Sequence, residues 1–239
     1  MPLGDNRFSG VRALIFDLDG TLIDSKLDLA LSINATLENM GREPLPHEKI
    51  FGMVGSGASV LVQRALGLKD VTDAEVDMGL AYFLSHYRSH MLDNTVAYPG
   101  VRECLALLKN YPMAVLTNKP VDFSRAILDG LGLAQYFRFV YGGNSFEKKK
   151  PHPMGVVTLL RELASQPKET MIIGDSAIDI QTARNSGVWA CGVTYGLGTE
   201  SLRAFPPDLM LDSLIELPAY LDGHATLSKV WLQPPYFFP

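Results

Sequence analysis

The chain has 239 residues, of which 47% are hydrophobic, and a formal net charge of -5. This length allows one large domain or a domain with a second one inserted into it, and the hydrophobic content excludes a disordered chain. The acidic balance argues against nucleic acid as the main partner, because a nucleic-acid backbone calls for a basic patch.

The first predicted element is an apolar strand over residues 11–16, which leads into the stretch FDLDGTLIDS at 16–25. Helical spacing follows over residues 28–40, 59–66 and 73–92, and no convincing strand lies between Ser25 and Thr95. Residues 23–95 are therefore predicted to form an inserted all-helical unit. The aromatic residues at 82, 83 and 87 are expected in its core.

From Pro99 onward, predicted strands and helices alternate. The strands span 113–116, 139–141, 170–173, 188–193 and 209–211, and the helices span 101–109, 121–131, 154–163 and 178–185. Alternation of this kind predicts βαβ units and a parallel sheet covered by helices on both faces. The expected fold is α/β, with a Rossmann-like three-layer core formed by residues 1–22 and 96–239. The Pro-rich, aromatic tail from Leu232 is expected to lie on the surface as an extended arm or to contact another subunit.

Polar and charged side chains gather at the predicted carboxyl ends of the strands, where open α/β sheets bind ligands. Each alone could be a turn, a cap or a solvated charge, but their joint appearance favours one shared site. They are Asp17 and Asp19, Thr117 and Asn118, Lys150, and Asp175 with Asp179 one helical turn later.

The residue types in this set point to phosphate chemistry. Several carboxylates close together repel one another unless a cation is present, and an oxygen-rich site of this kind suits Mg²⁺. The lysine and the hydroxyl would then face an anion that also touches the metal. One carboxylate can attack phosphorus, and a second can protonate the leaving oxygen and then activate water.

Several other features have ordinary explanations. The glycines of FGMVGSG at 51–57 lack the order of a nucleotide-binding loop, so a flexible loop or a helix beginning at Gly57 is predicted. His86 and His90 have a metal-ligand spacing but no third ligand, which favours a helix surface. The lysines at 148–150 are, as a run, typical of a solvated face.

The number and spacing of the cysteines and the hydropathy of the chain indicate the cellular compartment. The two cysteines are far apart and indicate a reducing, cytoplasmic environment, with both thiols as small core residues. No stretch approaches the roughly 18 apolar residues of a membrane span. We therefore expect a cytoplasmic protein with no membrane partner.

At these residues the chain resembles the phosphatases of the haloacid dehalogenase (HAD) superfamily. The matching motifs are DLDGT at 17–21, LTN at 116–118, Lys150-Pro151, and GDS at 174–176 followed by Asp179. Order and spacing agree over roughly residues 11–215, and the small helical cap of that superfamily corresponds to residues 25–95. DGTLIDS and VGSGASVLVQRAL, at 19–25 and 54–66, are most similar to bacterial phosphoglycolate phosphatases.

The resemblance implies a role for each matching residue. Asp17 would be the nucleophile, Asp19 the general acid and base, and Lys150 the group that neutralises phosphoryl charge and orients Asp17. The implied substrate-binding residues are Gly20, Thr117, Asn118 and Lys150. The implied Mg²⁺ ligands are Asp17, the backbone carbonyl of Asp19, Asp175, and Asp179 directly or through water.

Several alternatives remain open at this point. The substrate, a small phosphorylated metabolite, could be 2-phosphoglycolate, a sugar phosphate or pyrophosphate, and a phosphomutase or a non-catalytic phospho-accepting module would use similar residues. Dehalogenation is disfavoured, because dehalogenases of the superfamily lack an acid at the position of Asp19. Arg64 and the backbone of 55–57 are candidates for a substrate carboxylate, although Arg64 is more simply a helix-surface residue. Ala177 and Ile178 stand where relatives often have polar residues, and either a monomer or a homodimer is possible.

Overall fold

The computed structural model describes residues 6–67 and 71–221, and its central element is a six-stranded sheet. All neighbouring strands are parallel, in the order β5-β4-β1-β6-β7-β8. The strand that begins the chain's core is therefore central, between β4 and β6. The strands are β1 (Ala13–Phe16), β4 (Met113–Leu116), β5 (Phe139–Tyr141), β6 (Thr170–Gly174), β7 (Trp189–Val193) and β8 (Leu209–Leu211).

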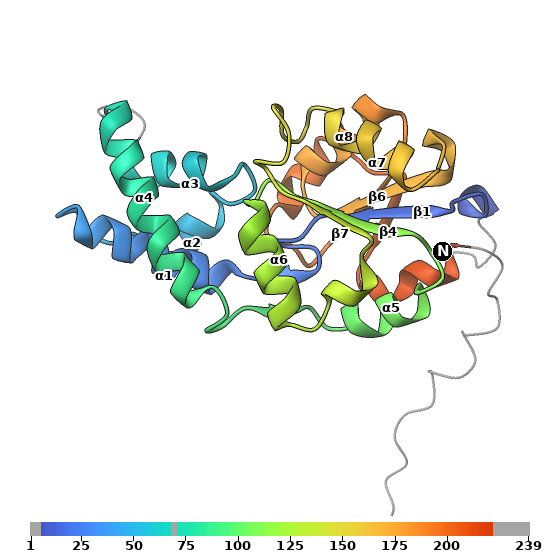
Figure 1. The fold of residues 1–239 in the computed structure, drawn as a ribbon, viewed down its shortest axis with the longest axis horizontal. Helices are drawn as coiled ribbons and strands as arrows, with labels where there is room; N and C mark the ends of the chain where they lie inside the picture. Colours follow the sequence, from blue (N-terminus) through green and yellow to red (C-terminus); the bar gives the residue numbers. More distant parts are fainter. Residues whose placement is uncertain (1–5, 68–70, 222–239) are drawn as a thin grey trace, which may run out of the picture.

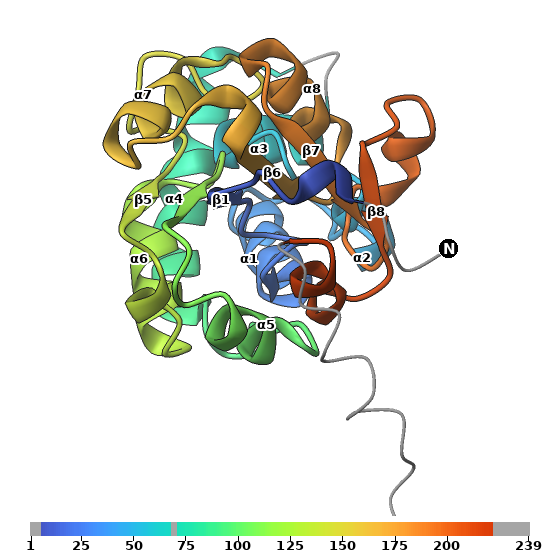
Figure 2. The same cartoon turned by 90° about the vertical axis from the view of Figure 1, so that its right-hand side faces the viewer.

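Helices cover both faces of this sheet, as the alternation of strands and helices predicts. On β1, Leu14 and Phe16 belong to the core on the side of α5 and α6, whereas Ala13 and Ile15 belong to the core under α7 and α8. Successive strand residues point to opposite faces, so every residue of β1 is buried. Figures 1 and 2 show the resulting three layers. The helices are α5 (Val101–Leu107), α6 (Val121–Gly130), α7 (Met154–Glu162) and α8 (Ala177–Ser186).

Four further helices form a separate group beside the carboxyl ends of the strands (Figure 1). They pack on one another, chiefly through α4 against α1 and α3. A short antiparallel pair, β2 (Ile23–Asp24) and β3 (Val96–Ala97), lies where the chain leaves for this group and returns from it. The helices are α1 (Lys26–Asn39), α2 (His47–Phe51), α3 (Ala58–Leu66) and α4 (Asp73–His90).

The expected elements are all present, with ends that differ by a few residues. The first strand begins at Ala13 rather than at residue 11, and the structure adds α2 and the β2–β3 pair, which the patterns do not predict. Gly57, at φ +94°, directly precedes α3, as the predicted helix start requires. Five short 3₁₀ helices complete the described chain: Asn6–Phe8, Ala134–Tyr136, Pro167–Glu169, Thr199–Arg203 and Leu214–Ala219.

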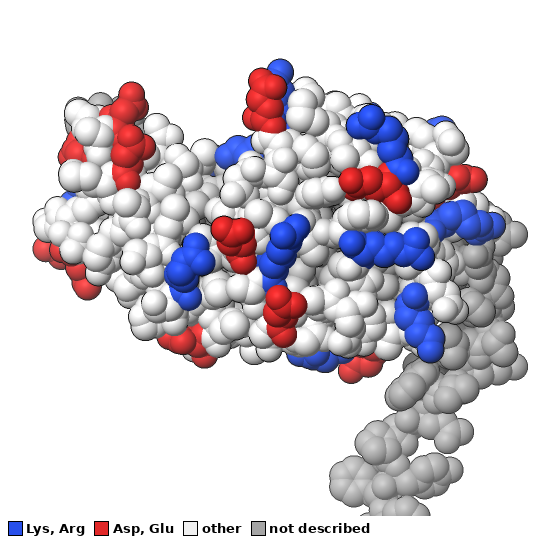
Figure 3. All heavy atoms as spheres, viewed as in Figure 1, with Lys and Arg blue, Asp and Glu red and all other residues white. Residues whose placement is uncertain are grey.

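The surface and the chain ends complete the description. On the face drawn in Figure 3, basic and acidic side chains are interspersed rather than gathered into one basic area. Within residues 6–67 and 71–221, no helix is long and apolar enough to cross a membrane. The expected arm from Leu232 lies outside the described residues.

Candidate active site

Three carboxylates meet at the carboxyl end of the sheet. Asp17 directly follows β1, Asp175 follows β6, and Asp179 lies in the first turn of α8. Because β1 and β6 are neighbours in register, their ends bring these side chains together. One carboxylate oxygen from each lies within 4.8 Å of the others, and among the described residues this is the one cluster of its kind.

Burial and mutual repulsion alter the acidity of this cluster. Burial, partly opposed by Lys150 and reinforced by Asp179, raises the pKa of Asp17 from 3.8 to about 6. Burial, together with the charges of Asp179 and Asp17, raises the pKa of Asp175 to about 7. A bound cation would relieve this repulsion, and the all-oxygen donor set fits a hard divalent ion. The cluster can therefore hold a metal ion.

Lys150 is the buried cation of the cluster, with 6% of its surface exposed. Its Nζ lies 2.9 Å from Asp17 Oδ1 and 2.6 Å from Asp179 Oδ1. Burial alone would lower the pKa of Lys150, but the two carboxylates raise it above its usual value. The reading of the lysine run as a solvated face is correct for the exposed Lys148 and Lys149 and wrong for Lys150.

Backbone groups and neighbouring side chains hold the other two carboxylates. Asp175 Oδ2 accepts hydrogen bonds from the backbone N–H groups of Leu197 (2.6 Å) and Gly198 (2.9 Å). Asp179 Oδ2 accepts from the hydroxyl and the backbone N–H of Ser176, which forms a capping box at the start of α8. Both oxygens of Asp179 thus already accept a hydrogen bond, Oδ1 from Lys150 and Oδ2 from Ser176.

Two glycines make room for this arrangement. A Cβ at Gly20, where φ is +83°, would collide with the carboxylate of Asp175. A Cβ at Gly196 would collide with Asp175 and with the carbonyl oxygen of Gly20. Gly20 is among the residues singled out from the sequence, but Gly196 is not, because no motif marks its distant loop.

The Asp19 carboxylate is not part of this cluster and pairs with another lysine. Its Oδ1 accepts a hydrogen bond of 2.5 Å from the Ser25 hydroxyl. Lys119 Nζ lies 3.1 and 3.2 Å from its two oxygens and also donates to the Tyr87 hydroxyl at 2.8 Å. Neither Lys119 nor Ser25 is identified from the sequence, although Lys119 directly follows Asn118.

Thr117 and Asn118 reach the same site from the end of β4, and both are buried. The Asn118 amide donates to the carbonyl oxygens of Gly55 and Lys150, each at 3.1 Å. It therefore ties the loop before α3 to the loop that carries Lys150. The Asn118 Oδ1 has no hydrogen-bond partner among the described residues, so it can accept a donor from a ligand.

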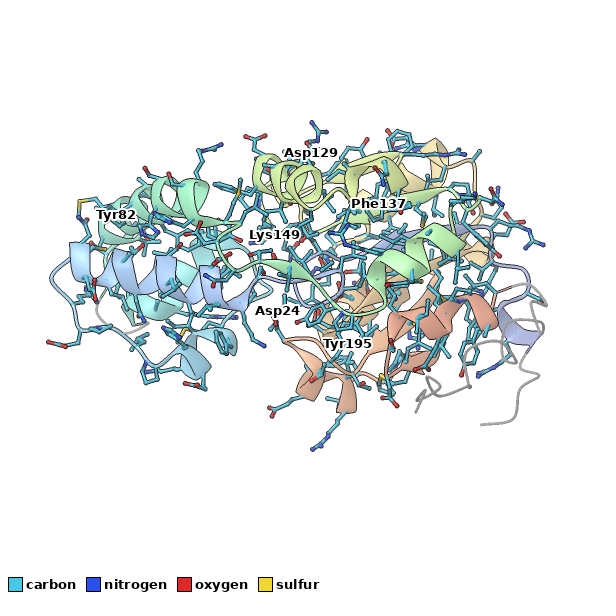
Figure 4. The ribbon with its side chains drawn as sticks, turned by 90° about the horizontal axis from the view of Figure 1, so that it is seen from below. Asp24, Tyr82, Asp129, Phe137, Lys149 and Tyr195 are labelled. Atoms are coloured by element: carbon cyan, nitrogen blue, oxygen red, sulfur yellow. The ribbon has the colours of Figure 1, made fainter. Side chains whose placement is uncertain are left out.

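The loop before α3 is also held at two other points. Lys149, which Figure 4 labels between the α1–α4 group and the sheet, donates to the Ser56 carbonyl at 2.5 Å. Arg64 donates to the Met53 carbonyl and the Ser56 hydroxyl. Arg64 is half-buried and braces the loop, which differs from both predictions for this residue, a helix surface and a ligand of the substrate carboxylate.

A pocket opens between the carboxylates and the helices α1, α3 and α4. Asp17, Asp19 and Thr117 form its polar end, together with the backbone at Gly55 and Gly57. Its opposite wall is largely apolar and is formed by Leu29, Val54, Leu61, Phe83, Leu84 and Phe123. His86 and His90 are not among the described lining residues, and they bond instead to Ser32 and Asp93.

The comparisons with known proteins agree with this fold. Residues 14–193 match the family model of haloacid dehalogenase-like hydrolases. A phosphoglycolate phosphatase of Pseudomonas putida is 40% identical over 211 residues, covering 85% of this chain and 77% of the relative. One from Chromobacterium violaceum is 38% identical over 214 residues, covering 87% and 95%.

A solved structure has the same fold. The crystal structure of a predicted phosphoglycolate phosphatase from Haemophilus somnus superimposes with a TM-score of 0.82 at 32% identity, covering 87% of this chain and 97% of that one. The chain therefore belongs to the haloacid dehalogenase-like hydrolase family. Its curated relatives make it a phosphatase of that family, which confirms the resemblance found in the motifs.

Proposed function

We propose that this phosphatase hydrolyses 2-phosphoglycolate to glycolate and phosphate, with Mg²⁺ as its cofactor. The observation that carries the proposal is the meeting of three carboxylates and a buried lysine at one end of the sheet. The names of the relatives support the substrate, since the chain is 35–40% identical to several phosphoglycolate phosphatases. The small, mostly apolar pocket is compatible with a small ester.

In the proposed mechanism Asp17 attacks phosphorus and becomes an aspartyl-phosphate. Asp19 gives a proton to the leaving oxygen and then takes one from the water that attacks the intermediate. Lys150 holds Asp17 in position, and its charge faces the phosphoryl oxygens. The Thr117 hydroxyl and the backbone N–H of Asn118 would donate to those oxygens, as oxyanion-binding groups do in other acyl and phosphoryl transfers. The Asn118 side-chain amide is occupied by Gly55 and Lys150, and Gly20, whose N–H bonds to Ile23, would contribute by leaving room for the phosphoryl group.

The metal would be held by Asp17, Asp175 and the backbone carbonyl of Asp19. Because both Asp179 oxygens already accept hydrogen bonds, we propose that Asp179 supports the metal through water and through its contact with Lys150. When bound, Mg²⁺ would neutralise charge on the phosphoryl group during transfer.

We further propose that the chain forms two domains with different functions. Residues 1–22 and 96–239 would form the core that performs the chemistry, and residues 23–95 the helical cap that selects the substrate. The loop before α3 supports this division, since it reaches the core through Gly55 and Ser56. Every proposed catalytic residue comes from one chain, so activity is compatible with either a monomer or a homodimer. The two free, buried thiols fit a reducing cytoplasm.

Purified protein is expected to release phosphate from 2-phosphoglycolate with a higher kcat/KM than from other small phosphorylated metabolites. The measurement is a phosphate-release assay over a panel of sugar phosphates, pyrophosphate and short carboxylated esters, with Mg²⁺ and with a chelator. Chelation should abolish turnover. Isomerised sugar phosphate without phosphate release would indicate a phosphomutase instead, and a long-lived phosphorylated form without turnover would indicate a signalling module.

Mg²⁺ affinity is expected to rise with pH. The raised pKa values of Asp17 (about 6) and Asp175 (about 7) mean that the metal-free folded protein holds protons that Mg²⁺ must displace. Binding measured by calorimetry should be at least about tenfold tighter at pH 8 than at pH 5.5. Equal affinity at the two pH values would contradict the assignment of these carboxylates as ligands.

The free energy of unfolding of the metal-free protein, in contrast to its Mg²⁺ affinity, should fall as pH rises. Both carboxyls have folded-state pKa values above 3.8, so the folded state binds more protons than the unfolded state between about pH 4 and 7. Their contribution to the free energy of unfolding therefore falls as pH rises through this window, and bound Mg²⁺ offsets the loss.

For the prediction on Mg²⁺ affinity, the control is Asp175→Asn, which should bind Mg²⁺ more weakly and with a smaller pH dependence.

A further inference from the structure

Lys119 is a buried cation that the proposed mechanism does not use. It follows Thr117 and Asn118 at the end of β4, and only 6% of its surface is exposed. Among the described residues that line the pocket, it is the only lysine or arginine. Its anionic partner within the protein is the Asp19 carboxylate, but Lys119 also lines the pocket, where a second anion could reach it.

Tyr87 from α4 fixes the position of the Lys119 ammonium group. The Tyr87 hydroxyl accepts a hydrogen bond of 2.8 Å, and the ammonium lies 4.5 Å from the centre of the Tyr87 ring. Burial, partly opposed by Lys119, raises the pKa of Tyr87 to about 12, so the hydroxyl stays neutral. Tyr87 therefore orients the charge of Lys119 without cancelling it.

The distance to Asp19 places Lys119 close to the leaving group. Lys119 Nζ is 3.1 and 3.2 Å from the two oxygens of the Asp19 carboxylate, which in the proposed mechanism touches the ester oxygen of the substrate. A group one or two bonds beyond that ester oxygen would therefore lie within reach of Lys119. In 2-phosphoglycolate the carboxyl carbon is two bonds from the ester oxygen.

The described lining of the pocket offers no other cationic side chain to a second anion. The wall around this point consists of apolar side chains, among them Leu61, Phe83 and Phe123. In such surroundings an unpaired carboxylate is strongly disfavoured, and a cation next to it attracts it more strongly than in water. Of the two candidates named from the sequence, Arg64 is engaged by the loop before α3 and is not among the described lining residues. The backbone at residues 55–57 does border the pocket, but it carries no full positive charge.

We propose that Lys119, held by Tyr87, binds the non-reacting carboxylate of the substrate and selects short phosphate esters that carry an anion two bonds from the ester oxygen. The inference rests on the proposed function and adds its specificity residue. It also gives the helical group a part in selection, because Tyr87 on α4 sets the position of a lysine on the sheet.

The test compares two substrates in the whole enzyme with Mg²⁺. Ethyl phosphate has the skeleton of 2-phosphoglycolate with a methyl group in place of the carboxylate. The wild type should prefer 2-phosphoglycolate in kcat/KM by at least about 30-fold, as expected for a buried, hydrogen-bonded charge pair. In Lys119→Met, which is one atom shorter than lysine and removes its charge, the preference should fall to within about threefold.

Two further variants make the result specific. Tyr87→Phe, which loses only the hydroxyl, should lower the preference by about three- to tenfold, and it keeps the proposal testable if Lys119→Met fails to fold. Lys148→Met removes the same charge from an exposed lysine that is not among the described lining residues of the pocket, and it should leave the preference unchanged.

Each outcome has a clear meaning. If Lys119→Met lowers kcat/KM for both esters by the same factor, Lys119 acts only through Asp19 and the proposal is overturned. An unchanged preference in Tyr87→Phe and Lys119→Met would overturn it as well. Failure of the proposed function would look different, since the wild type itself would then not hydrolyse 2-phosphoglycolate while it hydrolyses another ester.

Discussion

The Asp17→Asn variant is expected to release phosphate at least about 10⁴-fold more slowly than the wild type, because an amide cannot form the aspartyl-phosphate. The substitution keeps the shape of the side chain but removes the nucleophile and one oxygen of the carboxylate cluster. Steady-state phosphate release from 2-phosphoglycolate measures the loss. Acid quenching during turnover should trap a phosphorylated wild-type protein and none in the variant.

Folding of the Asp17→Asn variant should be unimpaired. Burial raises the pKa of Asp17 to about 6, so the carboxylate that is present at neutral pH destabilises the metal-free folded state, and removing its charge should not reduce stability. Lys150 keeps its contact of 2.6 Å with Asp179. Asp129→Asn, the same change at an exposed position on α6 (Figure 4), is the matched control and should retain full activity. More than a tenth of wild-type turnover in Asp17→Asn would rule out Asp17 as the nucleophile.

The core of the fold and most of the candidate site could be predicted because their signals are local. Short apolar strands alternating with helices define a parallel sheet, and residues at the carboxyl ends of its strands must share one edge. Asp17 and Asp175 meet for this reason, since β1 and β6 are neighbours. Lys150 could be placed there only through its motif, because its own surroundings in the sequence suggest a solvated run.

The contacts that could not be predicted join residues that are far apart in the sequence, and no helical or strand spacing of side chains links them. Tyr87 has the spacing of a core residue and is buried as predicted, but nothing in the sequence links its hydroxyl to Lys119. Gly196 is needed because its backbone passes against Asp175, a long-range approach without a local signature. The two-residue strands β2 and β3 are too short to produce an alternating pattern, and their pairing depends on how the helical group closes.

Asp28 is the clearest example of such a contact and has a large expected effect on stability. It lies in the first turn of α1, with 1% of its surface exposed. Its carboxylate accepts hydrogen bonds from the backbone N–H groups and the side chains of Asn94 and Thr95, at 2.7 to 3.0 Å. Asp28 thus fastens the point where the chain returns from the α1–α4 group to β3.

The Asp28→Asn variant is expected to lose about 3 kcal/mol of unfolding free energy, because either orientation of the new amide turns its NH₂ group against a backbone N–H. Thermal unfolding should show a melting temperature about 6 to 12 °C below that of the wild type. The matched control is Asp24→Asn, four residues earlier, which removes the same charge from a partly exposed ion pair with Lys26. Such pairs contribute little, so Asp24→Asn should melt within about 2 °C of the wild type. Equal melting temperatures for the two variants would mean that the buried Asp28 contacts do not hold the returning chain in place.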